Sequence, residues 1–355
     1  MTRKSSARAD VAGPPNMHHV AELAGVSVAT VSNVLNHPEK VADSTRGKVE
    51  SAIDQLGFTL NQTARALRSG DAHSIGLVVI DLTNSLFVDV ARGAQGRAQS
   101  NAFSLQLASA NNDLGMQDDH LQFFDSARAS GIILAPMQES DDQIRRVRRH
   151  GRPVVVVNFD SRLTDSCRVL IDNERAGYIA AKHLIDQGRT RIAFVAARDD
   201  YQPVHDRRMG ARAAVEEAGG TVELVELTTT DLDPTGGADA GERLAAMPAG
   251  TRPDAVLAVT DLLAMAIINE LTNSGVSVPE DVAVMGCDHN SAAWGGAIPL
   301  TSVAMQGEEM GRAAVDLLLA ELRDGPGEHV HRRVLLQPHL VVRESTVGRE
   351  RVAVP

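Results

Sequence analysis

Two short apolar patterns that meet at a glycine turn, within residues 20–36, constrain the fold of this chain most. Both patterns have helical spacing; the first comprises Val20, Leu23 and Ala24, and the second comprises Val31, Val34 and Leu35. Gly25 suits the left-handed end of a helix because it has no Cβ. Ser27 can cap a second helix by accepting a backbone N–H near Thr30. The spacing predicts two helices joined by a tight turn, either a helix-turn-helix or an ordinary αα-hairpin in a core.

The second predicted helix has a face outside its apolar stripe, and the side chains on that face are small or carry an amide. They are Val28, Ala29, Ser32, Asn33 and Asn36. Side chains of this size fit the major groove of DNA. Residues 28–35 are therefore predicted to be a recognition helix.

Two more helices are predicted before the body of the chain. One covers residues 43–56, with Asp43 or Ser44 as its cap and Gly57 at its end. In order, the segments AGVSVATVSNVLN, TRGKVESAIDQLGF, NQTARALRSG and SIGLVV resemble the start of a regulator of the lac-repressor (LacI/GalR) family. The third of these segments holds a short helix that Asn61 can cap. The resemblance rests on the order and spacing of four linked motifs, and it extends over nearly everything after residue 16.

The resemblance implies a dimeric, ligand-responsive regulator, in the simplest case a repressor, whose three-helix head binds a pseudo-palindromic double-stranded DNA operator. The residues expected to contact DNA are Ser27, Val28, Ala29, Thr30, Ser32, Asn33, Asn36, Thr45, Asn61, Ala64 and Leu67. Val28 and Ala29 can sense thymine methyl groups, and Asn33 is expected to prefer adenine where the family often has Arg. The match places Leu67 where the family inserts an apolar wedge between base steps in the minor groove. Its short helix, over residues 62–69, is expected to fold only on DNA.

Charge is distributed unevenly along the chain. The net charge of −11 would disfavour binding to DNA if it were spread evenly. Residues 1–70 hold eight Lys/Arg and six Asp/Glu, whereas the remainder holds 27 and 40. A mildly basic head on an acidic body is typical of a small DNA-binding module attached to an effector domain. The length of 355 residues suffices for two or three domains.

The compartment is expected to be the cytoplasm. Residues 1–15 are polar and contain Arg3, Lys4 and Arg8, so a disordered basic extension is expected there rather than a secretory signal. No run approaches the roughly 18 apolar residues of a membrane span, so no membrane partner is expected. Cys167 and Cys287 lie in unrelated segments, which suggests neither a disulfide framework nor a zinc site.

From residue 74 on, short apolar strands alternate with amphipathic helices. The alternation predicts an α/β fold with parallel sheets covered on both faces, and it restarts after residues 169–173 as a second doubly wound unit. Two such lobes joined by several crossings resemble the fold of periplasmic sugar-binding proteins. Ligands of such sheets bind beyond the carboxyl ends of the strands, here between the lobes.

The predicted organisation has four parts. They are the basic extension (1–15), a helix-turn-helix domain (16–61), a hinge helix and linker (62–73) and a core for effector binding and dimerisation (74–345). The first lobe of the core is expected to hold about residues 74–170 and 303–328. The second lobe is expected to hold about residues 171–302 and 329–345, with its last strand over 333–342. The tail after Arg343 lacks a heptad run, which favours a dimer over a tetramer.

Six residues are expected to bind the effector, a sugar or related metabolite: Asp81, Phe87, Asn158, Arg207, Thr260 and Asp288. Arg207 opens a segment that resembles the R-x-x-G of the family, and Asp288 ends one that resembles G-[YF]-D, with Cys287 in place of the aromatic. Together Arg207 and Asp288 offer the donor and acceptor that vicinal hydroxyls or a carboxylate require. The alternative is a structural salt bridge. Thr260 stands where the family often has Asn.

No enzymatic site is predicted, because the chain has neither a Gly-rich phosphate loop nor a G-x-S-x-G elbow. One face of a strand could carry both His329 and His331, but no third ligand is evident, so no metal or other cofactor is expected. The four arginines within residues 145–149 are expected to form a solvated helix face. The alternative function is a sugar-binding transport protein, which would need an export signal and would not carry residues 16–70.

Overall fold

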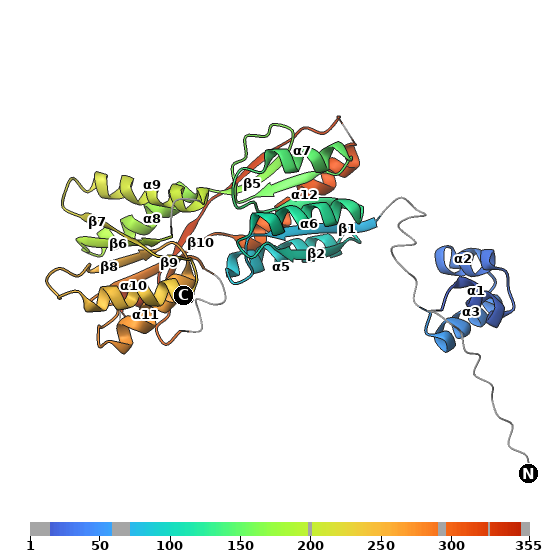
Figure 1. Cartoon of the computed structure of the whole chain (residues 1–355), viewed down its shortest axis with the longest axis horizontal. Helices are drawn as coiled ribbons and strands as arrows, with labels where there is room; N and C mark the ends of the chain where they lie inside the picture. Colours follow the sequence, from blue (N-terminus) through green and yellow to red (C-terminus); the bar gives the residue numbers. More distant parts are fainter. Residues whose placement is uncertain (1–14, 59–71, 198–200, 290–295, 326, 349–355) are drawn as a thin grey trace, which may run out of the picture. The chain divides into compact units, whose positions relative to one another are not determined.

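The computed structural model describes residues 15–58, 72–197, 201–289, 296–325 and 327–348. The chain forms two compact units, one that ends at Ala72 and one that begins at His73 (Figure 1). Residues 1–14 of the predicted extension and residues 62–71 of the predicted hinge and linker lie outside the described part.

The first unit is a bundle of short helices: α1 (Met17–Ala24), α2 (Val28–Asn36), a 3₁₀ turn η1 (Pro38–Lys40) and α3 (Asp43–Leu56). Gly25 ends α1 in the left-handed conformation, with φ of +67°, as the sequence predicts. The helices share a small core of Val20, Ala21, Val31, Val34, Val49 and Ala52. This core fixes the angle between α1 and α2 and leaves one face of α2 in solvent.

Two local predictions in this unit are wrong. Leu23 does not join the apolar stripe of α1, because 49% of its surface is exposed. No side chain caps α3, whose N-cap is Ala42. Asp43 is instead the first helical residue, where its negative charge interacts favourably with the helix dipole. Its carboxylate also pairs with Arg46 at 2.9 Å.

The second unit contains two six-stranded sheets, one in each lobe. The first sheet has the order β11-β5-β4-β3-β1-β2. Its strands are β1 (Ala72–Val79), β2 (Ser104–Ser109), β3 (Ala129–Leu134), β4 (Val154–Val157), β5 (Cys167–Ile171) and β11 (Arg333–Leu336). The second sheet has the order β12-β10-β9-β8-β6-β7. Its strands are β6 (Arg191–Ala196), β7 (Glu223–Thr228), β8 (Ala255–Ala258), β9 (Ala283–Asp288), β10 (Thr301–Ala304) and β12 (His339–Val341). Within this sheet β10 and β12 pair antiparallel, whereas β6–β7, β6–β8, β8–β9 and β9–β10 pair parallel.

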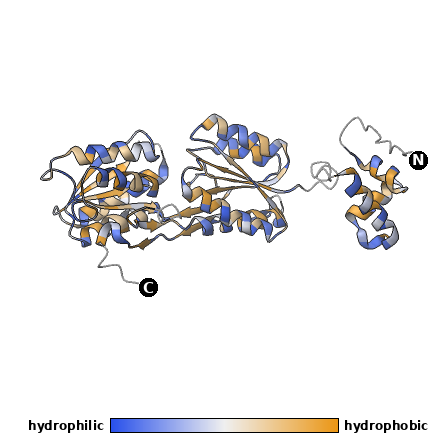
Figure 2. Cartoon of the chain, turned by 90° about the horizontal axis from the view of Figure 1, so that it is seen from below, coloured by the Kyte–Doolittle hydropathy of each residue, from blue (hydrophilic) through white to orange (hydrophobic). Residues whose placement is uncertain are grey.

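Helices cover both faces of each sheet, and the strands between them are the most apolar segments (Figures 1 and 2). The first lobe carries α5 (Ser85–Gln99) and α12 (Gly307–Asp324) on one face and α6 (Leu114–Ser126) and α7 (Asp141–Arg149) on the other. The second lobe carries α8 (Asn173–Asp186) and α9 (Gln202–Glu217) opposite α10 (Pro234–Ala246) and α11 (Asp261–Asn273). A short helix, α13 (Glu344–Val347), follows β12. The predicted α/β class, with a helix-turn-helix unit and a doubly wound core of two lobes, is confirmed.

Glycines bring pairs of helices into backbone contact in both lobes. A Cβ on Gly177 of α8 would lie 1.8 Å from the carbonyl oxygen of Arg207 in α9. A Cβ on Gly210 of α9 would in turn lie 1.8 Å from the carbonyl oxygen of Glu174. No side chain fits at either position, so the helices approach as closely as their backbones allow. This close approach holds the start of α9 against the start of α8.

The chain crosses between the lobes within residues 333–342, where the sequence predicts one strand of the second lobe. That prediction is wrong for the first half of the segment: β11 pairs with β5 of the first sheet, and only β12 joins the second sheet. Gln337 and Pro338 separate the two strands. Pro338 has no backbone N–H to donate to a ladder, so pairing stops there and the chain changes sheets.

Candidate functional site

The exposed face of α2 is the candidate nucleic-acid interface. Ser27 caps this helix: its Oγ accepts the backbone N–H of Thr30 at 3.1 Å and lies 2.9 Å from the Thr30 hydroxyl oxygen. Ala29 and Asn33 are exposed, whereas Val28 is half-buried and packs against the small core. The helix thus presents an amide and a methyl group side by side on a rigid support, as recognition in a major groove requires.

The remaining predicted DNA contacts are distributed less uniformly. Ser32 and Thr45 are half-buried, and the Thr45 backbone N–H closes the first turn of α3 on Ala42. The side chain of Asn36, and Asn61, Ala64 and Leu67 altogether, lie outside the described residues. The predicted DNA contacts therefore remain predictions.

The charge of the helical unit does not favour DNA. Among residues 15–58 the cationic residues are Lys40, Arg46 and Lys48, and the acidic residues are Glu22, Glu39, Asp43, Glu50 and Asp54. We therefore expect attraction to phosphate to come mainly from Lys and Arg elsewhere in the first 70 residues.

The candidate effector site lies beyond the carboxyl ends of strands in both lobes. Asn158 follows β4, Asp288 ends β9, and Arg207 lies in the first half of α9. Arg207 NH1 and Asp288 Oδ1 are 3.8 Å apart, and their side chains are only 5% and 2% exposed. The sequence therefore located a buried pair of opposite charges formed by residues 81 positions apart.

Two neighbours other than Asp288 hold Arg207 in place. Its Nε donates to Asn173 Oδ1 at 3.0 Å, and its NH1 donates to the carbonyl oxygen of Val259. Asn173 Nδ2 in turn donates to Asn158 Oδ1 at 3.4 Å, which joins the two lobes. The guanidinium is thus oriented before any ligand arrives, and such preorganisation lowers the entropic cost of binding.

One oxygen of the Asp288 carboxyl lacks a hydrogen-bond donor among the described residues. This oxygen, Oδ1, is buried. Burial raises the pKa of Asp288 to about 7, although the nearby Arg207 lowers it. A buried acceptor without a donor costs free energy, so the site favours a ligand that brings an O–H or N–H group to this oxygen.

Backbone strain marks two of the same positions. Asn158 has φ of +56° and Asp288 has φ of +127°, both in the region that disfavours residues with a Cβ. Strained residues of this kind persist only where the surrounding structure enforces them, and they concentrate at functional sites. In both cases the strained residue turns the chain out of a strand and aims a polar side chain.

Three other predicted effector residues have structural roles. The Asp81 carboxylate accepts the Thr83 backbone N–H at 2.9 Å and the Asn112 amide at 3.1 Å, so it ties two loops of the first lobe. Phe87 is buried in the core of the first lobe. Thr260 caps α11 by accepting the backbone N–H of Leu263 at 3.2 Å. Their contact with an effector remains a prediction.

Asn173 is a site residue that the sequence analysis missed. It is the first residue of α8, directly after β5 and Asp172, and it bridges Arg207 and Asn158. A polar residue immediately after an apolar strand is the signal that could have revealed it. Asn158 and Asn173 also line a pocket of about 270 Å³, with Asp160, Gln202 and Asp206 among its other walls.

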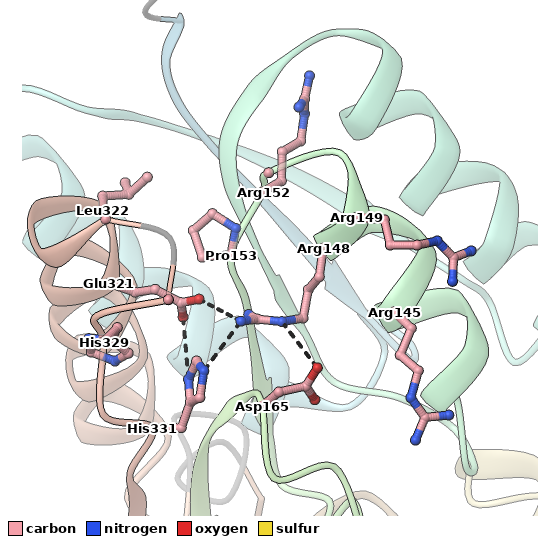
Figure 3. Close-up of a pocket in the computed structure, with 13 residues that line it drawn as sticks. Arg145, Arg148, Arg149, Arg152, Pro153, Asp165, Glu321, Leu322, His329 and His331 are labelled. Carbon is pink, nitrogen blue, oxygen red and sulfur yellow. Dashed lines mark hydrogen bonds and ion pairs between the residues drawn. The ribbon is translucent and has the colours of Figure 1, made fainter.

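A second pocket, of about 460 Å³, lies away from these residues, beside the amino end of β4 and the segment that leads into β11 (Figure 3). His329 and His331 line it, and the expectation that they have no third ligand is wrong. Cys167 and Glu321 lie beside them, with one ligand atom of each of the four residues within 4.8 Å of the others. Arg148, on the predicted solvated helix face, is also mostly buried here, with 16% of its side chain exposed.

The fold and the exposed face of α2 together define a class of protein: a DNA-binding module joined to a two-lobed ligand-binding body. Residues 16–61 match the family described as "Bacterial regulatory proteins, lacI family". Residues 181–346 match "Periplasmic binding protein-like domain". Among the described residues no helix is long and apolar enough to cross a membrane.

Comparison with known proteins gives the family. The chain is 31% identical over 330 residues to the HTH-type transcriptional repressor PurR of Photobacterium profundum, and the match covers 92% of this chain and 97% of that protein. A solved complex of the transcriptional regulator CelR with cellobiose is 28% identical, with a TM-score of 0.68 over 93% of this chain and 99% of that chain. The lac repressor dimer bound to operator and the anti-inducer ONPF has a TM-score of 0.79 at 23% identity, over 95% and 100% of the two chains. The chain belongs to the lacI family of transcriptional regulators, and it is a DNA-binding regulator with an effector-binding body.

Proposed function

We propose that this chain is a homodimeric repressor that binds a pseudo-palindromic operator through α2, and that a hydroxylated small molecule at Arg207 and Asp288 controls its affinity for DNA. The pair lies beyond the carboxyl ends of the strands, where α/β sheets bind their ligands. A sugar or related metabolite is the class of effector that fits, because its vicinal hydroxyls accept from a guanidinium and donate to a carboxylate. The cellobiose complex of a relative supports this class.

The observation that carries the proposal is the unfilled bonding capacity of a buried site. Arg207 is oriented by Asn173 and Val259, yet the nearest oxygen of Asp288 stays 3.8 Å away and accepts no hydrogen bond from the described residues. A purely structural salt bridge in such a dry place would close to direct contact, because an unmade buried bond is costly. A ligand hydroxyl supplies the missing donor.

We further propose that the chain acts in the cytoplasm and has no catalytic turnover. The relatives are transcriptional regulators, and the polar groups at Arg207 and Asp288 are arranged for binding. A regulator of this kind meets both its operator and its metabolite in the same compartment.

The test uses full-length protein, an operator chosen by in vitro selection, and a panel of sugars and related metabolites. Arg207→Ala and Asp288→Ala should each lower the affinity for the effector by about ten- to a hundredfold, because a charge-assisted hydrogen bond contributes roughly 1.5–3 kcal/mol. The effector should then no longer change operator binding. Operator binding without effector should change little. Calorimetry measures effector affinity and fluorescence anisotropy measures operator affinity.

Arg212→Ala is the matched control, because Arg212 lies on the same helix but is half-exposed and pairs with Glu226 at 2.9 Å. It should leave both affinities unchanged. Unchanged effector affinity in both Arg207→Ala and Asp288→Ala would exclude the pocket assignment.

A further inference from the structure

The amino-terminal edge of the first sheet gathers four metal-ligating side chains that effector binding does not use. Cys167 is the first residue of β5, and His329 and His331 lie in the segment that leads into β11. Because β5 and β11 pair in parallel with Arg168 opposite Arg333, this segment runs beside Cys167. Glu321, in the last turns of α12, completes the group.

Three of the distances between the ligand atoms match a tetrahedral metal site, and all four atoms lie within 4.8 Å of one another. Cys167 Sγ lies 3.3 Å from His329 Nε2 and 3.8 Å from His331 Nδ1, and His331 Nδ1 lies 3.8 Å from Glu321 Oε2. Bonds to Zn²⁺ of about 2.0–2.3 Å place the corners of a tetrahedron about 3.3–3.8 Å apart. Shifts of about 1 Å therefore suffice to bring the four ligand atoms to the corners of such a tetrahedron.

Neighbouring groups orient these ligands in the way that zinc sites require. His329 Nδ1 lies 2.7 Å from Asp324 Oδ2, a carboxylate contact that leaves Nε2 free to face Cys167. The backbone N–H of Arg332 donates to Cys167 Sγ at 3.4 Å, which stabilises a thiolate. Carboxylate–histidine pairs of this kind set the tautomer and raise metal affinity.

Burial and charge also favour an ion at this position. Cys167 is fully buried, and the side chains of His329, Glu321 and His331 are 5%, 10% and 20% exposed. Glu321 Oε2 is buried and accepts no hydrogen bond from the described residues. A thiolate and a carboxylate together neutralise a divalent cation. The adjoining pocket offers a path of entry from solvent (Figure 3).

We propose that Cys167, Glu321, His329 and His331 bind one Zn²⁺ ion in a closed, four-ligand site. A thiolate with two imidazoles selects a borderline-soft metal over Mg²⁺ or Ca²⁺. The ion joins β5, the end of α12 and the segment before β11, and it adds to the backbone hydrogen bond from the Arg168 N–H to the carbonyl oxygen of Arg332.

Arg148 competes with the ion for the same groups. Its NH2 lies 2.8 Å from Glu321 Oε1 and 3.4 Å from His331 Nε2, as the dashed lines in Figure 3 show. When Nδ1 of His331 holds the metal, Nε2 carries a proton and repels this donor. Arg148 therefore turns away from His331 upon metal binding, and Asp165, at 4.0 Å from Arg148 Nε, is the carboxylate placed to receive it.

The experiment uses the full-length protein, stripped with a chelator and then loaded with Zn²⁺ or Co²⁺. We expect one Zn²⁺ per chain by elemental analysis after gel filtration, and a higher midpoint of thermal unfolding with the metal. Co²⁺ should give a thiolate-to-metal charge-transfer band and the intense visible bands of tetrahedral coordination. Loss of all bound zinc on gel filtration, or a cobalt spectrum without the thiolate band, would overturn the proposal.

Variants separate metal binding from a structural role. Cys167→Ala should abolish the cobalt band and stoichiometric zinc, whereas Cys287→Ala and His339→Ala should retain both. Asp324→Asn, at a half-exposed side chain, should lower zinc affinity by about 10- to 100-fold without unfolding the chain. Arg148→Gln should tighten zinc binding, because it removes the competing cation. Equal zinc affinity in Cys167→Ala and Cys287→Ala, or weaker binding in Arg148→Gln, would contradict the site.

Discussion

At the residue scale, the candidate effector site contains polar groups that are buried away from water. Asp288 is buried beside a cation that does not reach it, and Asn158 aims its amide from a left-handed backbone. On α2 the situation is reversed, because Asn33 is exposed and its amide has both a donor and an acceptor to offer. Each of these side chains has bonding capacity that a ligand or a base pair can use.

Asn33 should read adenine. Its amide can accept from N6 and donate to N7 of an adenine in the major groove, a pairing worth about 1–3 kcal/mol against the wrong base. Operator selection with Asn33→Arg should therefore shift the preference at one base pair toward guanine. Equal weakening of all operators by Asn33→Ala would indicate a phosphate contact instead.

Asp288 should make stability depend on pH. Because burial raises its pKa to about 7, the folded chain keeps a proton on this carboxyl that the unfolded chain has lost above its ordinary pKa of 3.8. The higher pKa in the folded state stabilises the fold, and this stabilisation is fully present below pH 3.8. It falls as pH rises toward about 7, by at most about 1.4 kcal/mol per pH unit.

Denaturant unfolding of the wild type and Asp288→Asn across this range measures that slope. The variant should be less sensitive to pH, because its side chain does not titrate. Parallel pH profiles would show that Asp288 keeps the same pKa in both states.

At the element scale, the site depends on how closely helices approach. The start of α9 is held against the start of α8 by Gly177 and Gly210, and Arg207 lies at that contact. A comparable pair, Gly93 and Gly311, joins α5 to α12 in the first lobe. In both lobes, small residues thus set the distance between helices on one face of the sheet.

Gly177→Ala should damage both stability and effector binding. Its methyl group would lie 1.8 Å from the carbonyl oxygen of Arg207, so the helices must separate. Overpacking of this kind costs about 1–3 kcal/mol or more, and the displacement moves Arg207 away from Asp288. Urea unfolding and effector calorimetry measure the two effects.

Gly96→Ala in α5 is the matched control, because nothing lies within 4 Å of the added methyl group. It should stabilise the chain by about 0.4–1 kcal/mol through the lower entropy of the unfolded state. The same loss of stability in both variants would mean that close packing of α8 on α9 is not the cause.

At the scale of the whole molecule, most basic residues of the first 70 lie outside the helical unit that contains α2. The helices that present α2 hold more acidic than basic residues, and the body is strongly acidic. We therefore expect base recognition and attraction to phosphate to come from different parts of the chain. The basic residues outside residues 15–58 and before residue 72 are Arg3, Lys4, Arg8, Arg65 and Arg68.

Replacement of Arg3, Lys4 and Arg8 together by Ala should weaken binding to nonspecific DNA. It should also reduce the slope of log affinity against log salt by up to about 0.9 for each phosphate that the protein no longer neutralises. The preference among operators should not change, because phosphate contacts carry no base information. Anisotropy titrations at several salt concentrations test this, and an unchanged slope would show that these residues make no phosphate contact.

Local patterns in the sequence determined much of this protein. The spacing of apolar residues and the turn at Gly25 predicted α1 and α2, because a helix repeats about every 3.6 residues whatever surrounds it. The alternation of strands and helices predicted the doubly wound lobes. Arg207 and Asp288 were identified through their resemblance to family motifs, and the position of Asp288 at a strand end agrees with the rule that ligands gather at the carboxyl ends of parallel strands.

Only the tertiary structure decided which distant segments meet. No local pattern predicts that β11 pairs with β5 while the next strand, β12, joins the other sheet, because strand pairing depends on contacts between segments far apart in the sequence. That single pairing brings His329 to Cys167 across 162 positions, and no spacing of residues announced the cluster. The bridge by Asn173 and the orphaned oxygen of Asp288 likewise arise from packing between elements. Helices and strands follow from residues close together in the sequence, whereas these sites need contacts between distant segments, which form only when the core packs.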